Sequence, residues 1–146
     1  PKGDMGKIGL SVCPTMPDRV YAAVTAGEGE GGVYRSEDRG ASWERVSDNS
    51  ASKVRCDPND PDRVYILTDG DGISIDGGRT FEYNPVIDCC APGNTVHIDN
   101  HAFWINPTDP RHLIIGNDGA VLNRHRKLMP TNPERMVHGF IKSFGS

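Results

Sequence analysis

Hydrophobic and polar residues alternate along much of the chain, and this alternation sets the expected secondary structure. Ile8, Leu10 and Val12 are separated by small or polar residues, as in a strand with one buried face. Two later segments, "RVYAAVTA" (19–26) and "RVYILTD" (63–69), follow Pro/Asp turns and are rich in β-branched and aromatic residues. No segment has the sustained apolar period of about 3.6 residues that marks a helix. The pattern therefore predicts an all-β protein.

A turn phrase built on two prolines occurs three times along the chain. Its first prolines, Pro14, Pro58 and Pro107, are 44 and 49 residues apart. A period in the forties is typical of β-propeller blades, each an antiparallel sheet of four strands. We therefore expect a partial propeller over residues 1–119, with about two and a half to three blades, placed at 6–48, 51–84 and 96–119 onward.

A second repeated phrase reads Ser-x-Asp-x-Gly-x-Ser/Thr-aromatic. It occurs as "SEDRGASW" (36–43), which we name box one, and as "SIDGGRTF" (74–81), which we name box two. The Asp can accept hydrogen bonds from turn N–H groups, the Gly permits a positive φ, and the hydroxyl closes the other side. The aromatic residues are expected to pack between neighbouring blades. Because a folding device is needed in every blade, we interpret both boxes as structural, through Ser36, Asp38, Gly40, Ser42, Trp43, Ser74, Asp76, Gly78, Thr80 and Phe81.

These boxes resemble the Asp-box (BNR) repeat of sialidases, xyloglucanase-like glycoside hydrolases and sortilin-type propellers. The segments "GKIGLSVCPTMPDRVYAAV", "HIDNHAFWINPTDP" and "IIGNDGA" are similar to those of bacterial sortilin-type and glycosyl-hydrolase-like repeat proteins. The resemblance covers about residues 6–120. It implies a β-propeller and an extracytoplasmic or secreted protein, and it assigns no function, since one fold hosts many chemistries.

The chain departs from the repeat pattern in two places. The third strand of blade two is shorter than its counterpart by two residues, and no box follows "IIGNDGA" in blade three. We therefore expect residues 120–146 to be a degenerate or disordered tail. A closed ring needs about 4–8 blades, so the chain is expected to be a fragment of a longer protein or to self-associate.

The link between blades two and three, residues 84–101, is long, and in a propeller such a link lies near the central channel. His97, Asp99 and His101 alternate within it and would share one face of a strand. They could hold a divalent metal, act as acid and base on a sugar, or simply begin a hydrogen-bonded strand. We interpret them as a ligand-facing polar cluster and assign no metal, because a fourth ligand is missing.

Glycoside hydrolysis needs two carboxylates across the scissile bond. Asp88, Asp99 and Asp118 are available near the expected channel face, but their mutual placement depends on further blades. "NDG" at 117–119 and "DGDGISID" at 69–76 are better explained as turns than as sites. We therefore assign no catalytic residue and no cofactor.

Composition narrows the remaining classes. No apolar run of about 18 residues is present, so no membrane span is expected. Residues 120–146 hold five basic residues against Glu134, but no helical stripe or interleaved aromatics, so nucleic acid is not an expected partner. Cys13 and Cys56 occur in similar repeat phrases, so we predict that they lie on inner strands too far apart to be linked. With Cys89 and Cys90 they are expected to be free thiols.

The sequence thus favours a non-catalytic scaffold or ligand-binding segment of a propeller, with an unknown ligand that is a carbohydrate or a protein. The alternative is part of a sialidase-like or xyloglucanase-like glycoside hydrolase acting on polysaccharide.

Overall fold

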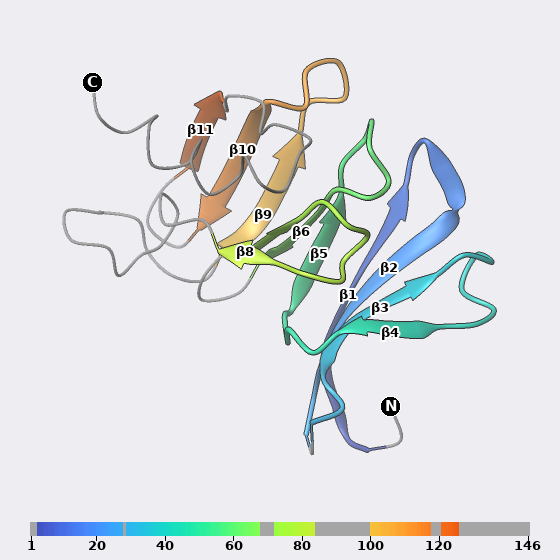
Figure 1. Cartoon of the computed structure of the whole chain (residues 1–146). Helices are drawn as coiled ribbons and strands as arrows, with labels where there is room; N and C mark the ends of the chain where they lie inside the picture. Colours follow the sequence, from blue (N-terminus) through green and yellow to red (C-terminus); the bar gives the residue numbers. More distant parts are fainter. Residues whose placement is uncertain (1–2, 28, 68–71, 84–99, 118–120, 126–146) are drawn as a thin grey trace.

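The computed structural model describes residues 3–27, 29–67, 72–83, 100–117 and 121–125, and it is built from antiparallel sheets. Three sheets follow one another along the chain and pack in sequence order (Figure 1). The prediction of an all-β protein is confirmed. We keep the names blade one, two and three for the successive sheets.

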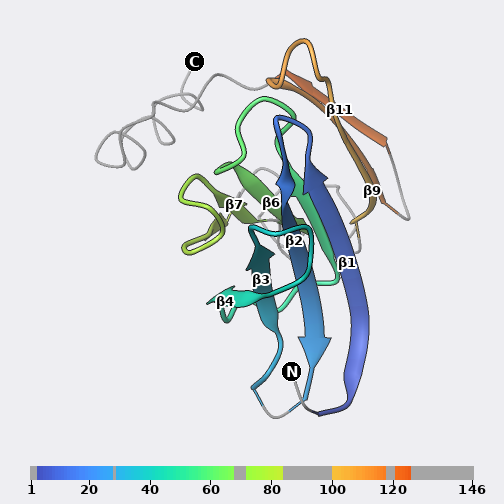
Figure 2. The ribbon, with the colours of Figure 1, turned by 90° about the vertical axis from the view of Figure 1, so that its right-hand side faces the viewer.

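Blade one is a four-stranded sheet in the order of the chain. It comprises β1 (Met5–Cys13), β2 (Met16–Ala26), β3 (Gly32–Ser36) and β4 (Glu44–Ser47). Figure 2 shows β1 and β2 as a long hairpin that extends past the shorter β3 and β4. The alternating residues Ile8, Leu10 and Val12 pair with Val24, Ala22 and Val20, so one face of this hairpin is apolar throughout.

Blades two and three repeat the plan with shorter strands. Blade two comprises β5 (Lys53–Cys56), β6 (Val64–Leu67), β7 (Gly72–Ser74) and β8 (Glu82–Tyr83). Blade three comprises β9 (Asn100–Ile105), β10 (His112–Asn117) and β11 (Val121–His125), in the order β11-β10-β9. Residues 121–125 were expected in the tail, but they pair with β10 as a third strand, which corrects that part of the boundary. Residues 126–146 lie outside the described residues.

Two apolar clusters fill the spaces between successive blades. Blade two has a buried face toward each neighbour, which explains why all four residues of β6 are buried. Its alternate side chains therefore enter different clusters, as the period of two along a strand requires. The first cluster contains Cys13, Tyr21, Ala23, Val33, Ala51, Val54, Cys56, Val64 and Ile66, and the second contains Tyr65, Leu67, Ile73, Phe103, Ile105, Leu113 and Ile115.

Cys13 and Cys56 form a disulfide with a Cα–Cα distance of 5.3 Å, so the prediction that they are free and unlinked is wrong. The error lies in the repeat register. Pro14 and Pro58 are 44 residues apart, but the cysteines are separated by 43, because Asp57 is an extra residue between Cys56 and its proline. A shift of one residue turns a strand side chain to the opposite face of its sheet. Cys13 therefore faces blade two while Cys56 faces blade one, and they meet. Cys89 and Cys90 lie outside the described residues.

The two boxes close their turns with the same hydrogen bonds. The Asp38 carboxylate accepts bonds from the Ser42 amide at 2.8 Å and the Ser42 hydroxyl at 2.6 Å, and the Ser36 hydroxyl accepts a bond from the Gly40 amide at 2.8 Å. In box two the equivalent bonds from Thr80 to Asp76 are 2.9 and 2.6 Å long, and the bond from the Gly78 amide to Ser74 is 2.9 Å. Gly40 and Gly78 have φ values of 92° and 83°. Each role that the sequence suggests for these polar residues and glycines is therefore present in the turn.

Box two also packs against blade one. Gly78 lies so close to Tyr21, Val33 and Val46 that an added Cβ would be 3.3 to 3.5 Å from their side chains. The Arg35 guanidinium of β3 donates a 3.1 Å hydrogen bond to the Gly77 carbonyl. Box two thus contacts the blade that precedes it in the chain.

The aromatic residues of the two boxes differ in their surroundings, because in the described part of the chain only box two has a preceding blade. Phe81 packs against the cluster between blades one and two. Trp43 folds over Gly40, donates its indole N–H to the Gly40 carbonyl, and is 42% exposed. The expected packing between blades is therefore seen for Phe81, while for Trp43 the described residues provide no preceding blade.

Candidate functional site

The first strands of the three blades lie next to one another, as the innermost strands of a propeller do. The β1 and β5 backbones approach so closely at Gly9 that an added Cβ would be 2.7 Å from the Ser52 carbonyl oxygen. The Cys56 amide of β5 donates a 2.9 Å hydrogen bond to the Ser11 hydroxyl of β1. β5 is instead joined to β9 by hydrogen bonds from two of its side chains.

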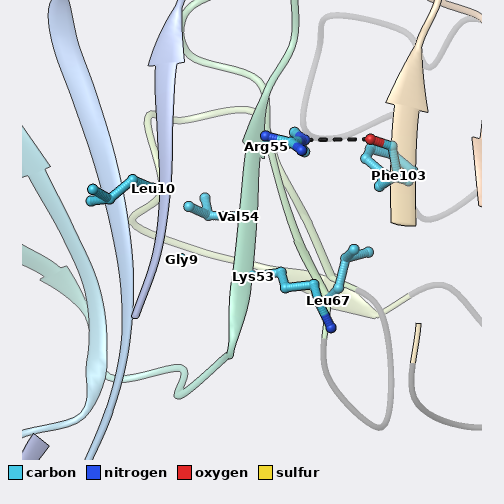
Figure 3. Close-up of a pocket in the computed structure, with 7 residues that line it drawn as sticks. All are labelled: Gly9, Leu10, Lys53, Val54, Arg55, Leu67 and Phe103. Carbon is cyan, nitrogen blue, oxygen red and sulfur yellow. Dashed lines mark hydrogen bonds between the residues drawn. The ribbon is translucent and has the colours of Figure 1, made fainter. Parts of the chain in front are cut away.

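A small pocket of about 120 Å³ opens along these strands. We name it the inner-strand pocket. Figure 3 shows that Lys53, Arg55, Leu67 and Phe103 lie on the β9 side of β5, whereas Val54 points toward β1. The residues that line the pocket are Gly9, Leu10, Lys53, Val54, Arg55, Leu67 and Phe103.

Two cationic side chains hold the β5–β9 side of this pocket together. The Lys53 ammonium donates a 2.9 Å hydrogen bond to the Asn100 carbonyl, and the Arg55 Nε–H donates a 3.3 Å bond to the Phe103 carbonyl. Both residues belong to β5 and are two positions apart, so their side chains leave the strand on the same face. Leu67 lies on β6, where it pairs with Lys53 of β5, and both Leu67 and Phe103 are buried. The pocket therefore combines two positive charges with an apolar floor.

A second group of charges, at the junction of blades one and two, is internally paired. The Arg19 guanidinium donates to Glu37 at 3.0 Å and to Asp62 at 2.5 Å, and the Tyr21 hydroxyl donates to the Pro61 carbonyl at 2.9 Å. Burial lowers the pKa of Arg19, but the hydrogen bonds to Glu37 and Asp62 outweigh it, and the net shift is upward. Burial raises the pKa of the Tyr21 phenol. Because these charges pair with one another, we interpret this group as structural, holding blades one and two together.

The structure tests little of the polar cluster expected from the sequence. His97 and Asp99 lie outside the described residues. His101 lies in β9, next to the residue whose carbonyl binds Lys53. Asp88 and Asp118 also lie outside the described residues. Among the residues that the structure does describe, no group of three or more His, Cys, Asp or Glu side chains could hold a metal ion. The cluster of His97, Asp99 and His101 stays a prediction.

Lys53 and Arg55 were not predicted as site residues from the sequence. The signal that could have found them is the alternation "KVRC", which places two cations on one face of an inner strand. Lys53 and Arg55 matter because they face β9. Their hydrogen-bond partners there, Asn100 and Phe103, are 47 and 48 residues later in the chain.

The described residues contain no helix long and apolar enough to cross a membrane.

No protein-family profile and no curated protein matches the sequence. Among solved structures, the chain is similar to a GH74 enzyme from Niastella koreensis, with a TM-score of 0.64 and 15% identity over 86% of this chain and 22% of that one. It is also similar to an ancestral GH74 enzyme, with a TM-score of 0.58 and 22% identity over 77% of this chain and 13% of that one. The chain thus spans no more than about a fifth of the length of these enzymes.

The chain has the fold of a partial β-propeller. In this fold the first strand of each blade lies nearest the central axis, so the inner-strand pocket lies on the inner side of the blades. At these identities the similarity establishes the fold and nothing about the chemistry.

Proposed function

We propose that this chain is a non-catalytic segment of an Asp-box propeller of the sortilin type, which binds a ligand at its inner strands. The observation that supports this function is the inner-strand pocket, which three successive blades line. Its lining includes two cations and five uncharged residues, and no carboxylate. Such a surface can bind a ligand through hydrogen bonds and apolar contacts, but by itself it offers no acid–base pair.

The alternative function is part of a glycoside hydrolase that acts on polysaccharide. The GH74 enzymes among the similar structures favour it. Such chemistry requires two carboxylates about 5–9.5 Å apart. The Asp38 and Asp76 carboxylates are engaged by their own turns. The candidates Asp88, Asp99 and Asp118 lie outside the described residues.

An experiment on the 146-residue chain separates the two functions. In one assay the chain would be incubated with xyloglucan, and newly formed reducing ends would be measured. In a second, the ¹⁵N-labelled protein would be titrated with neutral and acidic monosaccharides, and its amide chemical shifts would be recorded. We expect no new reducing ends and shifts centred on β5 and β9. Sustained release of reducing ends, abolished by Asp99→Asn but retained in Lys7→Met, would overturn the non-catalytic function.

We further propose an extracytoplasmic or secreted location. The Cys13–Cys56 disulfide supports it, because disulfides persist in oxidising compartments and are rare in the cytosol. Peptide mapping of the protein from its native source, with thiols blocked at lysis, would test this location. Recovery of Cys13 and Cys56 in the blocked, reduced form would contradict it.

A further inference from the structure

Among the contacts of the described residues, the cations of the inner-strand pocket use only a part of their hydrogen-bonding capacity. Lys53 has three N–H donors, and one of them reaches the Asn100 carbonyl. Arg55 uses its Nε–H for the Phe103 carbonyl, which leaves the two Nη groups at the end of the guanidinium. The carbonyl contacts fix the direction of each side chain. The remaining N–H donors of each side chain are therefore already positioned, which lowers the entropic cost of binding a ligand.

The described carboxylates do not neutralise these two charges. Ion pairs within the described ranges involve Arg19, Arg35, Arg39, Arg63 and Arg111, and neither Lys53 nor Arg55 takes part in one. The buried apolar residues beside them, Leu67 and Phe103, reduce the screening by water on that side. Lys53 is half-buried and Arg55 is exposed, so an anionic group would be attracted here by two neighbouring cations beside an apolar surface.

The size and lining of the pocket limit the ligand further. About 120 Å³ corresponds to roughly four water molecules, so the pocket holds one small acidic group with a few attached carbon atoms. The end of a guanidinium is planar and matches the two oxygens of a carboxylate. The Leu67 and Phe103 side chains offer an apolar surface to the carbon atoms that carry it.

We propose that the inner-strand pocket binds the carboxylate of an acidic ligand, with Arg55 as the bidentate donor and Lys53 as the second cation. This proposal rests on the proposed function and adds the chemistry of the ligand. Because both cations also hold β9, a bound carboxylate would stiffen the junction of blades two and three.

Matched pairs of charged and neutral compounds test the proposal. The ¹⁵N-labelled chain would be titrated with glucuronate and glucose, and separately with N-acetylaspartate and N-acetylasparagine. We expect the acids to shift the amide signals of Lys53, Arg55 and Phe103, and the neutral partners to bind at least about tenfold more weakly. Affinity should fall as salt is added. Comparison of the two acids shows whether the ligand body is a sugar or a peptide.

Variants locate the binding. Arg55→Gln and Lys53→Met should each weaken acid binding about tenfold or more, Arg55→Lys should weaken it less than Arg55→Gln, and the exposed Lys7→Met on β1 should leave it unchanged. Unfolding midpoints of the variants would exclude a loss of fold. Equal binding of an acid and its neutral partner at the pocket would overturn this inference but retain the proposed function. The absence of any shift at the pocket with all four compounds would overturn both.

Discussion

One aspartate closes each box turn, and the two aspartates differ in their surroundings. The Asp38 carboxylate lies at the surface, and hydrogen bonds led by the Ser42 hydroxyl hold its pKa at about 2, below its ordinary value of 3.8. Burial opposes the shift at Asp76, but hydrogen bonds from Thr80 outweigh it, and its pKa is also lowered. Both folded turns therefore favour the charged carboxylate.

Acid should weaken both turns. A carboxyl group whose pKa is depressed by folding stabilises the protein above its unfolded pKa, and this contribution disappears as pH falls through the folded value. For Asp38 the window runs from about pH 4 down to about pH 2. We expect the unfolding midpoint to fall over this window, and the fall to be smaller in Asp38→Ala and in Asp76→Ala. Thermal unfolding followed by circular dichroism from pH 6 to pH 2 measures both effects.

At neutral pH, Asp76→Ala should destabilise the chain by about 1–2 kcal/mol, because it removes the charged acceptor of several hydrogen bonds within the turn. Asp38→Ala should cost less, because in the described part of the chain its turn packs against no other blade. The exposed Asp48→Ala serves as the control and should behave like the parent. Equal midpoints for Asp76→Ala and Asp48→Ala would contradict the structural role of the box.

At the scale of elements, each turn and strand is stabilised by the blade beside it. The glycines at the same position of the two boxes show this dependence. Among the described residues, the atoms nearest to a Cβ added at Gly40 belong to Trp43 of its own turn, while Gly78 lies against Tyr21, Val33 and Val46 of blade one. The same change at these two positions therefore separates the strain within the turn from the packing between blades.

We expect Gly40→Ala to cost about 1–2 kcal/mol, since its φ of 92° disfavours a Cβ. Gly78→Ala should cost about 1–3 kcal/mol more, because the new methyl group would crowd the blade-one side chains at 3.3 Å. Urea unfolding of the two variants and the parent gives the difference directly. If the two substitutions cost the same, box two does not dock on blade one as described.

The disulfide joins the first strands of two blades across 43 residues of chain. Closing a loop of this length restricts the unfolded state, and its loss should cost about 2–4 kcal/mol. We therefore expect the double variant Cys13→Ser, Cys56→Ser to unfold at lower urea concentration than the parent. Reductant should lower the parent to a similar midpoint and should not affect the variant. A parent protein whose midpoint is unchanged by full reduction would contradict a linking role.

At the scale of the whole molecule, blade two is covered on both faces and blade one on one face. Ile8, Leu10 and Val12 on the other face of β1 are 49%, 59% and 55% exposed. The corresponding face of blade two, with Val54, Cys56, Val64 and Ile66, is covered by blade one. In a longer propeller the uncovered face of blade one would meet another blade, and in the isolated chain it is available for association.

We expect the isolated chain to associate as its concentration rises, because association buries this apolar face. The double variant Ile8→Lys, Val12→Lys should suppress association, because buried lysines without partners are costly. Asp48→Lys, which adds positive charge at an exposed position elsewhere, is the control. Light scattering over a range of concentrations measures the effect. A parent that remains monomeric throughout would show that this face needs no partner in the isolated chain.

Local features of the fold could be predicted from the sequence. The alternation of β1, the second strands "RVYAAV" and "RVYIL", and the shortened β7 are all present as expected. The boxes were predictable because Asp38 and Asp76 bind residues four positions later in the same turn. The third strand of blade three was not predicted, since β11 lacks the box that marks a blade and is defined by its pairing with β10.

The contacts between blades were decided only by the tertiary structure. A single extra residue, Asp57, turns Cys56 toward Cys13, and no periodic pattern in the sequence shows that the two faces then oppose each other. Lys53 and Arg55 line a pocket only because β9 lies opposite β5. The sequence by itself determined the strands, the turns and the class of fold, because these depend on residues within a few positions of one another. The disulfide and the pocket depend on how whole sheets stack, because the stacking decides which residues more than 40 positions apart come into contact.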